Sequence, residues 1–258
     1  MWAECAVTII TVISYTMDMP SMLMMDINVM SDTTYLGTYG CPRIFLFDAL
    51  PPDADEHAVK SYATFLQRMR GRHYVNATML MFDEHMCMPE MLTRAMDHVK
   101  TPLVFVRQYD RAFLRRVPLR DIVDHMLQDK EPNVKLISFQ STGMTREDHL
   151  LHRVPTLVSG MKMTRMYYMD HSHLTWKKEY MEKLLPAYRY VSKKYNASSC
   201  YLEVYLAIYY DYLTLRELRE RNYFLFGSPP ADFAYTTHFR TTQRFFPLRA
   251  LWWWLVHL

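Results

Sequence analysis

The chain has 258 residues, enough for one large domain with a substantial hydrophobic core. Half of its residues are hydrophobic and 22% are charged, which excludes a mostly disordered chain. It has 6 glycines and neither a G-x-x-x-x-G-K-S/T nor a G-x-G-x-x-G segment, which excludes glycine-loop nucleotide sites. The net charge is +3 without a dense run of Lys and Arg, so we expect no nucleic-acid partner.

The first half of the chain alternates short apolar runs with helical patterns. The run 6–13 is rich in β-branched residues and too short for a helix, which predicts a buried strand. This alternation favours an α/β fold with a mostly parallel central sheet flanked by helices. We expect strands at 6–13, 43–47, 75–82, 102–107 and 134–139, and helices at 21–30, 55–70, after Pro89 and after Pro118.

Beyond residue 140 the alternation gives way to a polar loop and longer helical patterns. No repeat and no linker rich in Pro, Gly and Ser divides the chain. The prediction is a single domain over residues 1–245 with a small C-terminal antiparallel element, followed by a Trp/Arg-rich tail at 246–258. The elements expected here are a strand at 161–168, helices at 176–195 and 201–221, and short strands at 223–226 and 233–237.

The cysteines give no sign of a metal or redox site. Cys5, Cys41, Cys87 and Cys200 lie far apart in the sequence and form no C-x-x-C pair. This pattern favours a reducing compartment, and we expect the protein in the cytoplasm. No stretch reaches the roughly 18–20 apolar residues that span a bilayer, so no transmembrane segment is expected.

Polar side chains follow the predicted strands at the edge where α/β sheets bind ligands. That edge lies outside the carboxyl ends of the strands. Ser14, Asp48 and Asp110 each follow a predicted strand, and the acidic groups suit a divalent cation that bridges phosphate oxygens. Aspartates at these positions are also typical helix caps and turn formers, so both interpretations stay open.

Several short motifs connect the chain to one enzyme family. They are V-T-I-I (7–10), C-P-R-I-F-L-F-D (41–48), E-H (84–85), T-P-L-V-F-V-R-Q-Y-D-R (101–111), V-K-L-I-S-F (134–139), Y-M-D-H-S-H (168–173), Y-L-E (201–203) and T-H-F-R (237–240). In these motifs and their order, the chain resembles the GT-A-type nucleotide-sugar glycosyltransferases of large algal viruses and algae. Among them is the N-terminal glycosyltransferase domain of a chlorovirus protein, a rhamnosyltransferase. The resemblance spans residues 5–245 and implies a GT-A fold, a UDP-sugar donor and a glycan acceptor.

The resemblance also implies a metal-assisted donor site. Tyr109 and Asp110 match the acidic motif that ends a strand, so Asp110 would hold Mn²⁺ or Mg²⁺ on the diphosphate of the donor. His238 matches the histidine that completes this metal site, and Arg240 belongs to the same motif. Asp and His are both acceptable ligands for Mn²⁺.

Further roles follow from the same resemblance. Ser14 and Asp48 match positions that meet the nucleoside. Asp170 and Glu203 fall in acceptor-side segments, and either carboxylate would take the proton from the acceptor hydroxyl. An inverting displacement needs only that base and a metal that neutralises the charge on the leaving diphosphate.

The chain departs from the family pattern at four places. Ala49 stands where glycine is common, Val204 replaces the second carboxylate of an acidic pair, and Phe239 stands where aspartate is usual. The two residues before Asp110 include no carboxylate. A GT-A-fold module that binds a glycan or a protein without catalysis is therefore the alternative function.

Other polar or aromatic features have structural interpretations. His171 and His173 have no third ligand nearby in the sequence, which favours a structural or acceptor-facing role over zinc binding. Cys87 is interpreted as a buried structural cysteine. The tail mixes tryptophan with arginine, which suits either contact with protein or a peripheral position at a membrane surface.

Overall fold

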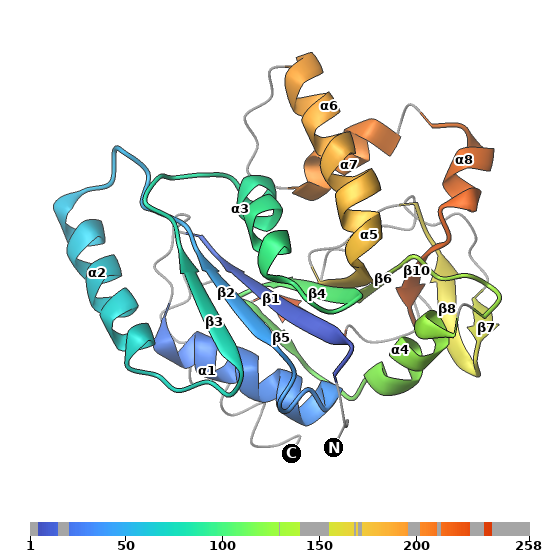
Figure 1. Cartoon of the computed structure of the whole chain (residues 1–258), viewed down its shortest axis with the longest axis horizontal. Coiled ribbons are helices and arrows are strands. Elements are labelled where there is room, and N and C mark those ends of the chain that lie inside the picture. Colours follow the sequence, from blue (N-terminus) through green and yellow to red (C-terminus); the bar gives the residue numbers. More distant parts are fainter. Residues whose placement is uncertain are drawn as a thin grey trace.

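The computed structural model of the chain describes residues 5–14, 21–128, 130–139, 155–167, 169, 172–195, 202–210, 213–227 and 235–238, with the backbone alone at 203, 237 and 238. These residues form a central sheet with helices on both faces, the predicted α/β architecture (Figure 1). None of the helices in these ranges is long and apolar enough to cross a bilayer. The tail at 246–258, with its predicted protein or membrane contact, lies outside the described residues.

The central sheet has nine strands. They are β1 (Val7–Ile13), β2 (Arg43–Phe47), β3 (Ala77–Met81), β4 (Leu103–Gln108), β6 (Leu136–Phe139), β7 (Thr156–Val158), β8 (Met161–Arg165), β9 (His173–Trp176) and β10 (Tyr223–Phe226). Their order is β3-β2-β1-β4-β9-β6-β10-β8-β7, and β8 and β9 run against the other seven. The sheet is therefore mostly parallel, as predicted. Every residue of β1 is buried, because helices cover both faces of the sheet.

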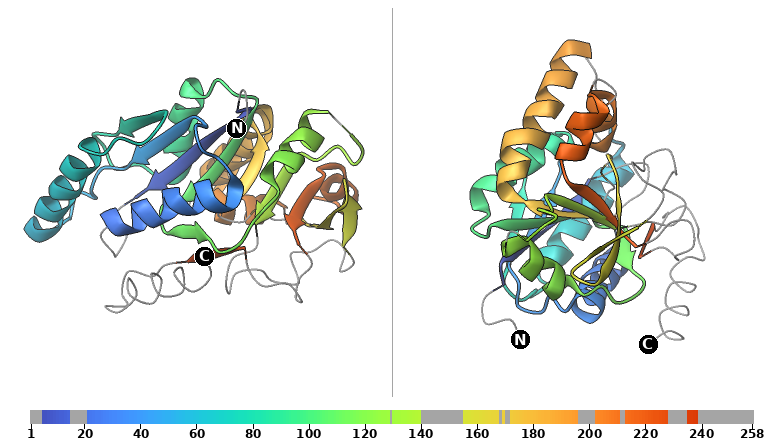
Figure 2. Two further views of the ribbon diagram at one scale, coloured as in Figure 1. Left: turned by 90° about the horizontal axis from the view of Figure 1, so that it is seen from below. Right: turned by 90° about the vertical axis from the view of Figure 1, so that its right-hand side faces the viewer.

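The helices divide between the two faces of the sheet. Helices α1, α2 and α4 cover one face, and α3 with α5, α6 and α7 covers the other (Figures 1 and 2). A π-helical segment continues α1, and a second π-helical segment joins α5 to α6. The bounds are α1 Met22–Ser31, its π-helical extension Asp32–Leu36, α2 Glu56–Arg70, α3 Met88–Ala95, α4 Leu119–Leu127, α5 Lys177–Glu179, the second π-helical segment Tyr180–Leu184, α6 Leu185–Tyr195, α7 Leu202–Tyr210 and α8 Leu215–Glu220.

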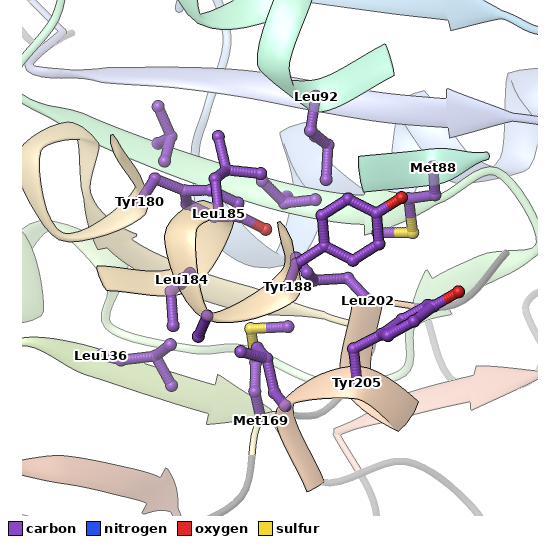
Figure 3. Packing of buried hydrophobic residues seen from close by; sticks show 14 of the residues in the cluster. Met88, Leu92, Leu136, Met169, Tyr180, Leu184, Leu185, Tyr188, Leu202 and Tyr205 are labelled. Atoms are coloured by element: carbon purple, nitrogen blue, oxygen red, sulfur yellow. The ribbon is translucent and has the colours of Figure 1, made fainter. Parts of the chain in front are cut away.

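A large part of the core lies between the sheet and the helices α3, α6 and α7. Figure 3 shows Leu92 of α3 pointing toward Tyr188 of α6, with Tyr205 of α7 close by. The rings of Tyr188 and Tyr205 meet edge to face, with 4.7 Å between their centroids. This packing holds the helical layer against the strands.

A second, two-stranded sheet lies beside the first. It pairs β5 (Arg111–Phe113) with β11 (Thr236–His238) in antiparallel register, so the predicted small antiparallel element is confirmed. β5 follows β4 after a two-residue turn. The small sheet therefore joins the end of a central strand to the C-terminal part of the described chain.

Several predicted elements differ from the observed ones. The predicted helix 201–221 is two helices, α7 and α8, and the strands β5, β7 and β9 were not predicted. β9 enters between β4 and β6, antiparallel to both. These short strands have no distinct apolar run in the sequence, and their tertiary pairing determines them.

The cysteines also differ from expectation. Cys5 and Cys41 form a disulfide with their Cα atoms 5.2 Å apart, and Cys87 is disulfide-bonded too. Cys5 and Cys41 are 36 residues apart in the sequence, but they precede the neighbouring strands β1 and β2. Disulfides persist in oxidising surroundings, so this pair argues against the predicted reducing compartment.

Candidate donor site

Register brings the ends of three parallel strands together. Ile13 at the end of β1 pairs with Phe47 of β2, and Val12 pairs with Gln108 of β4. From β1, the sheet continues through β2 and β3 in one direction. In the other direction it continues through β4, so the strand order reverses between β1 and β4. Ligands of open α/β sheets bind at such a switch point. The predicted positions Ser14, Asp48 and Asp110 thus follow the ends of three neighbouring strands.

The small sheet brings the segment of Asp110 close to the strand of His238. Asp110 ends the turn between β4 and β5. In the β5–β11 pairing, His238 lies opposite Arg111, the residue directly after Asp110. The side chain of His238 is outside the description. Within the described residues, no group of three His, Cys, Asp or Glu side chains gathers at one point.

Asp110 lies beside a buried cation. The side chain of Arg107 is fully buried, and burial lowers its pKa to about 9 while the attraction of Asp110 acts in the opposite direction. Arg107 therefore keeps its charge at neutral pH, so a buried positive charge lies close to the carboxylate of Asp110. Asp110 is half-buried, and its Oδ1 atom is inaccessible to solvent. A carboxylate and an imidazole are both residue types that suit Mn²⁺, and phosphate oxygens and water would complete such a set.

Asn28 of α1 holds the turn that carries Asp110. Its Nδ2 atom donates to the carbonyl oxygens of Gln108 (3.3 Å), Tyr109 (2.9 Å) and Arg111 (3.1 Å). Asn28 is 1% exposed, so these bonds form away from solvent. The amide thereby fixes the backbone on both sides of Asp110.

Two further residues of the same helix face extend this contact. Ser31 Oγ accepts a hydrogen bond from the backbone N–H of Phe113 in β5 (3.1 Å). Asp32 pairs with Arg43 of β2 (2.8 Å between Nη1 and Oδ2) and with Arg107 of β4. Asn28, Ser31 and Asp32 lie at positions i, i+3 and i+4, which share one face of a helix. We call them the α1 polar stripe.

The α1 polar stripe was not predicted from the sequence, although a signal was present. The segment 22–36 is mostly apolar, and the three polar residues of the stripe recur in it at helical spacing. Arg107 gives a second signal, because a charged residue near the end of an apolar strand requires a buried partner. Neither signal identifies the other element of the contact.

Asp48 is bound within the protein. Its Oδ1 accepts from the N–H of Met86 (2.8 Å), and its Oδ2 lies 3.1 Å from Nδ1 of His85. Its backbone oxygen accepts from the hydroxyl of Tyr62 (2.6 Å). Burial raises the pKa of Asp48, and the bond from Met86 partly opposes this rise. The carboxylate ties the segment after β3 to the end of β2, and its contact with a nucleoside stays a prediction.

The remaining predicted site residues lie at different distances from this edge. Ser14 is half-buried directly after β1. Tyr109 is 6% exposed and packs in the core between α1, α2 and the sheet. Glu203 lies in α7, with only its backbone described, and Asp170 and Arg240 lie outside the described residues. The predicted roles of all five stay predictions.

His173 has a structural position. It lies in β9 with no exposed surface, and its Nε2 atom is 2.8 Å from the hydroxyl of Tyr180. The two rings stack, with their centroids 5.7 Å apart. This fits the structural alternative predicted for the histidine pair.

Comparison with solved structures relates the fold to transferases. GalNAc-T7, solved with UDP, GalNAc and Mn²⁺, has 8% identity and a TM-score of 0.54 over 92% of this chain and 43% of its own. TarS from S. aureus has 9% identity and a TM-score of 0.51 over 95% and 38%. A candidate glucose-1-phosphate thymidylyltransferase from Bacillus anthracis, in complex with sucrose, has 12% identity and a TM-score of 0.50 over 95% and 93%.

These likenesses concern the fold. The chain spans less than half the length of the GalNAc-T7 and TarS chains. No protein-family profile matches the sequence, and no curated protein matches it. The chain has a GT-A-like α/β fold, as predicted from its motifs.

Proposed function

We propose that the chain is a glycosyltransferase that moves a sugar from a nucleoside diphosphate donor, a UDP-sugar, to a hydroxyl of a glycan. One observation carries the proposal: the turn with Asp110 lies at the switch point of a GT-A-like sheet, beside the strand of His238. GalNAc-T7, a structural neighbour, is solved with UDP, a sugar and Mn²⁺, which supports this class of donor. The narrower likeness to enzymes of algal viruses stays an expectation.

The residues of the turn have defined tasks in this proposal. Asp110 and His238 would hold Mn²⁺ or Mg²⁺ on the donor diphosphate. When bound, the cation neutralises the charge that grows on the leaving diphosphate. Asn28 fixes the backbone around Asp110, and the buried Arg107 places a positive charge near it. Tyr109 and Arg240 are proposed to contribute to donor binding near this turn.

The nucleoside and the acceptor would be bound by residues outside this turn. Ser14 and Asp48 are proposed to meet the nucleoside at the ends of β1 and β2. Asp170 or Glu203 is proposed as the base that removes the proton of the acceptor hydroxyl in an inverting displacement. The proton moves to the carboxylate as the new glycosidic bond forms and the bond to the diphosphate breaks.

A thermal-shift measurement with UDP tests the donor site. A ligand that binds the folded state stabilises it by about 2.7 kcal/mol at 100 times its Kd. For a chain of this length we expect a rise in Tm of roughly 5–10 °C with UDP and Mn²⁺ together, and little change with UDP alone. Asp110→Asn should abolish the Mn²⁺-dependent part. Asp124→Asn, on the exposed surface of α4, is the matched control and should retain the full rise.

The other outcomes distinguish the alternative functions. A chain that releases UDP from a UDP-sugar acts as a glycosyltransferase, whereas release of pyrophosphate from a nucleoside triphosphate and a sugar phosphate would show a nucleotidyltransferase. A glycan- or protein-binding module would show neither product and no shift with UDP. A shift that survives Asp110→Asn would overturn the metal assignment.

A further inference from the structure

The turn that carries Asp110 connects two different sheets. It joins β4, in the large sheet, to β5, in the small sheet, and the chain changes sheets within two residues. A ligand for a metal must be held within a few tenths of an ångström of its productive position. Side-chain contacts from outside the two sheets add to that precision.

The amide of Asn28 has the geometry for this task. Three carbonyl oxygens surround its Nδ2 atom, those of Gln108, Tyr109 and Arg111. The amide nitrogen has two hydrogens, so the three carbonyls share them in a branched arrangement. The three acceptors also fix the orientation of the amide, because a flipped Asn28 would place its oxygen against carbonyl oxygens.

Burial makes these bonds specific. Asn28 is 1% exposed, so water does not readily replace the amide in these bonds. The Oδ1 atom of Asn28 has no hydrogen-bond partner within the described residues. All the hydrogen bonding of this side chain is therefore directed at the turn.

Ser31, one turn further along the α1 polar stripe, binds the backbone of β5. Ser31 Oγ accepts from Phe113 of β5, the strand that pairs with β11 and so with the backbone of His238. Arg107 adds a hydrogen bond from Nη2 to the carbonyl oxygen of Arg111. One helix face thus contacts both the turn that carries Asp110 and β5, the strand that pairs with β11.

We propose that Asn28 is a positioning residue of the donor site, which sets the Mn²⁺ affinity of Asp110 by holding the carbonyl groups of residues 108, 109 and 111. The inference rests on the proposed function for its metal. The three hydrogen bonds from Asn28 to the turn, which we call the clamp, are a property of the free protein. Asn28 touches neither donor nor acceptor in this assignment. Its effect passes through the backbone of the turn.

The experiment compares Asn28→Ala with Thr164→Val. Both variants remove a buried side-chain donor to a backbone carbonyl. Thr164 lies in β8, away from the turn, and its Oγ1 donates to the carbonyl oxygen of Gly227 (3.0 Å). We measure the Mn²⁺ concentration that gives half of the UDP-dependent rise in Tm. Asn28→Ala should increase it by roughly tenfold or more, and Thr164→Val should leave it within about twofold, whatever each does to Tm alone.

Amide hydrogen exchange of peptides that cover residues 108–113 provides a measurement without metal or nucleotide. Exchange should be faster by roughly tenfold in Asn28→Ala and unchanged in Thr164→Val. If Asn28→Ala does not fold, Ser31→Ala replaces it and should accelerate exchange at Phe113.

Equal exchange in the variants and the wild type would overturn the clamp. An unchanged Mn²⁺ midpoint with faster exchange would overturn its role in metal binding. A wild-type protein without any Mn²⁺-dependent response would instead overturn the proposed function.

Discussion

The carboxylate of Asp48 and the imidazole of His85 lie against each other at the end of β2, with 3.1 Å between Oδ2 and Nδ1. The same imidazole nitrogen is 2.9 Å from the carbonyl oxygen of Ala49. With the bond from Met86 N–H to Asp48, these contacts fasten the segment between β3 and α3 to the neighbouring strand. A residue predicted to bind a nucleoside thus also has a structural task.

The burial of Asp48 predicts a pH-dependent stability. Its carboxyl group is 2% exposed, and burial raises its pKa above the ordinary value of 3.8. The folded protein therefore binds this proton more tightly than the unfolded chain. By linkage, this group contributes stability below pH 3.8 that is lost as the pH rises through its folded pKa.

Asp48→Asn should remove that dependence. As the pH rises from 3 to 7, the Tm of Asp48→Asn should increase relative to that of the wild type, because asparagine has no charge to bury. Thermal unfolding across this pH range measures the difference. Asp53→Asn, at an exposed position of the following loop, serves as control. A difference in Tm that stays constant with pH would show that Asp48 is not the titrating group.

Most strands of the central sheet could be predicted from the sequence because burial on both faces leaves a continuous apolar run, whereas β7 and β9 were missed. The predicted strands 43–47 and 223–226 agree with β2 and β10 at both ends. Proline and capping residues gave the helix starts to within about a residue or two, as with Asp55, whose carboxylate accepts from the N–H of Ala58 (2.7 Å). Local chemistry was sufficient for these elements.

The candidate site could be predicted only in part. Asp48 and Asp110 were found because they follow apolar strands, and parallel strands end at one edge of a sheet. Asn28 could not be found in this way, since polar residues on a helix usually face water. Its role depends on how α1 packs against β4 and β5, and tertiary structure alone determines that contact.

The disulfide between Cys5 and Cys41 should contribute strongly to stability. It closes a loop across a sequence separation of 36 residues, for which the loss of chain entropy in the unfolded state amounts to roughly 3–4 kcal/mol. The double variant Cys5→Ala, Cys41→Ala should lower the free energy of unfolding by about that amount. Denaturant unfolding of the oxidised proteins measures it. We use a variant rather than a reductant because Cys87 is also disulfide-bonded. Equal unfolding midpoints would contradict the pairing.

Asp32 carries the negative charge of a buried ion cluster. It has no exposed surface and pairs with the guanidinium groups of Arg43 and Arg107, which are 5% and 0% exposed. Burial lowers the pKa of Arg43 to about 10 and that of Arg107 to about 9, yet both values lie above neutral pH, so both side chains keep their charge. Two buried cations therefore depend on this carboxylate and on the nearby Asp110.

Asp32→Asn keeps the shape of the side chain and removes its charge. Removal of one partner from a buried ion cluster costs about 3–5 kcal/mol, because the remaining charges stay buried without compensation. The exposed pair Arg216–Glu220 provides the contrast, with side chains that are 88% and 62% exposed and a nitrogen–oxygen distance of 2.9 Å. Glu220→Gln should change stability by no more than about 0.5 kcal/mol. Urea unfolding of both variants at neutral pH measures the two changes. If Asp32→Asn costs no more than Glu220→Gln, then Asp32 does not balance the buried charges of Arg43 and Arg107.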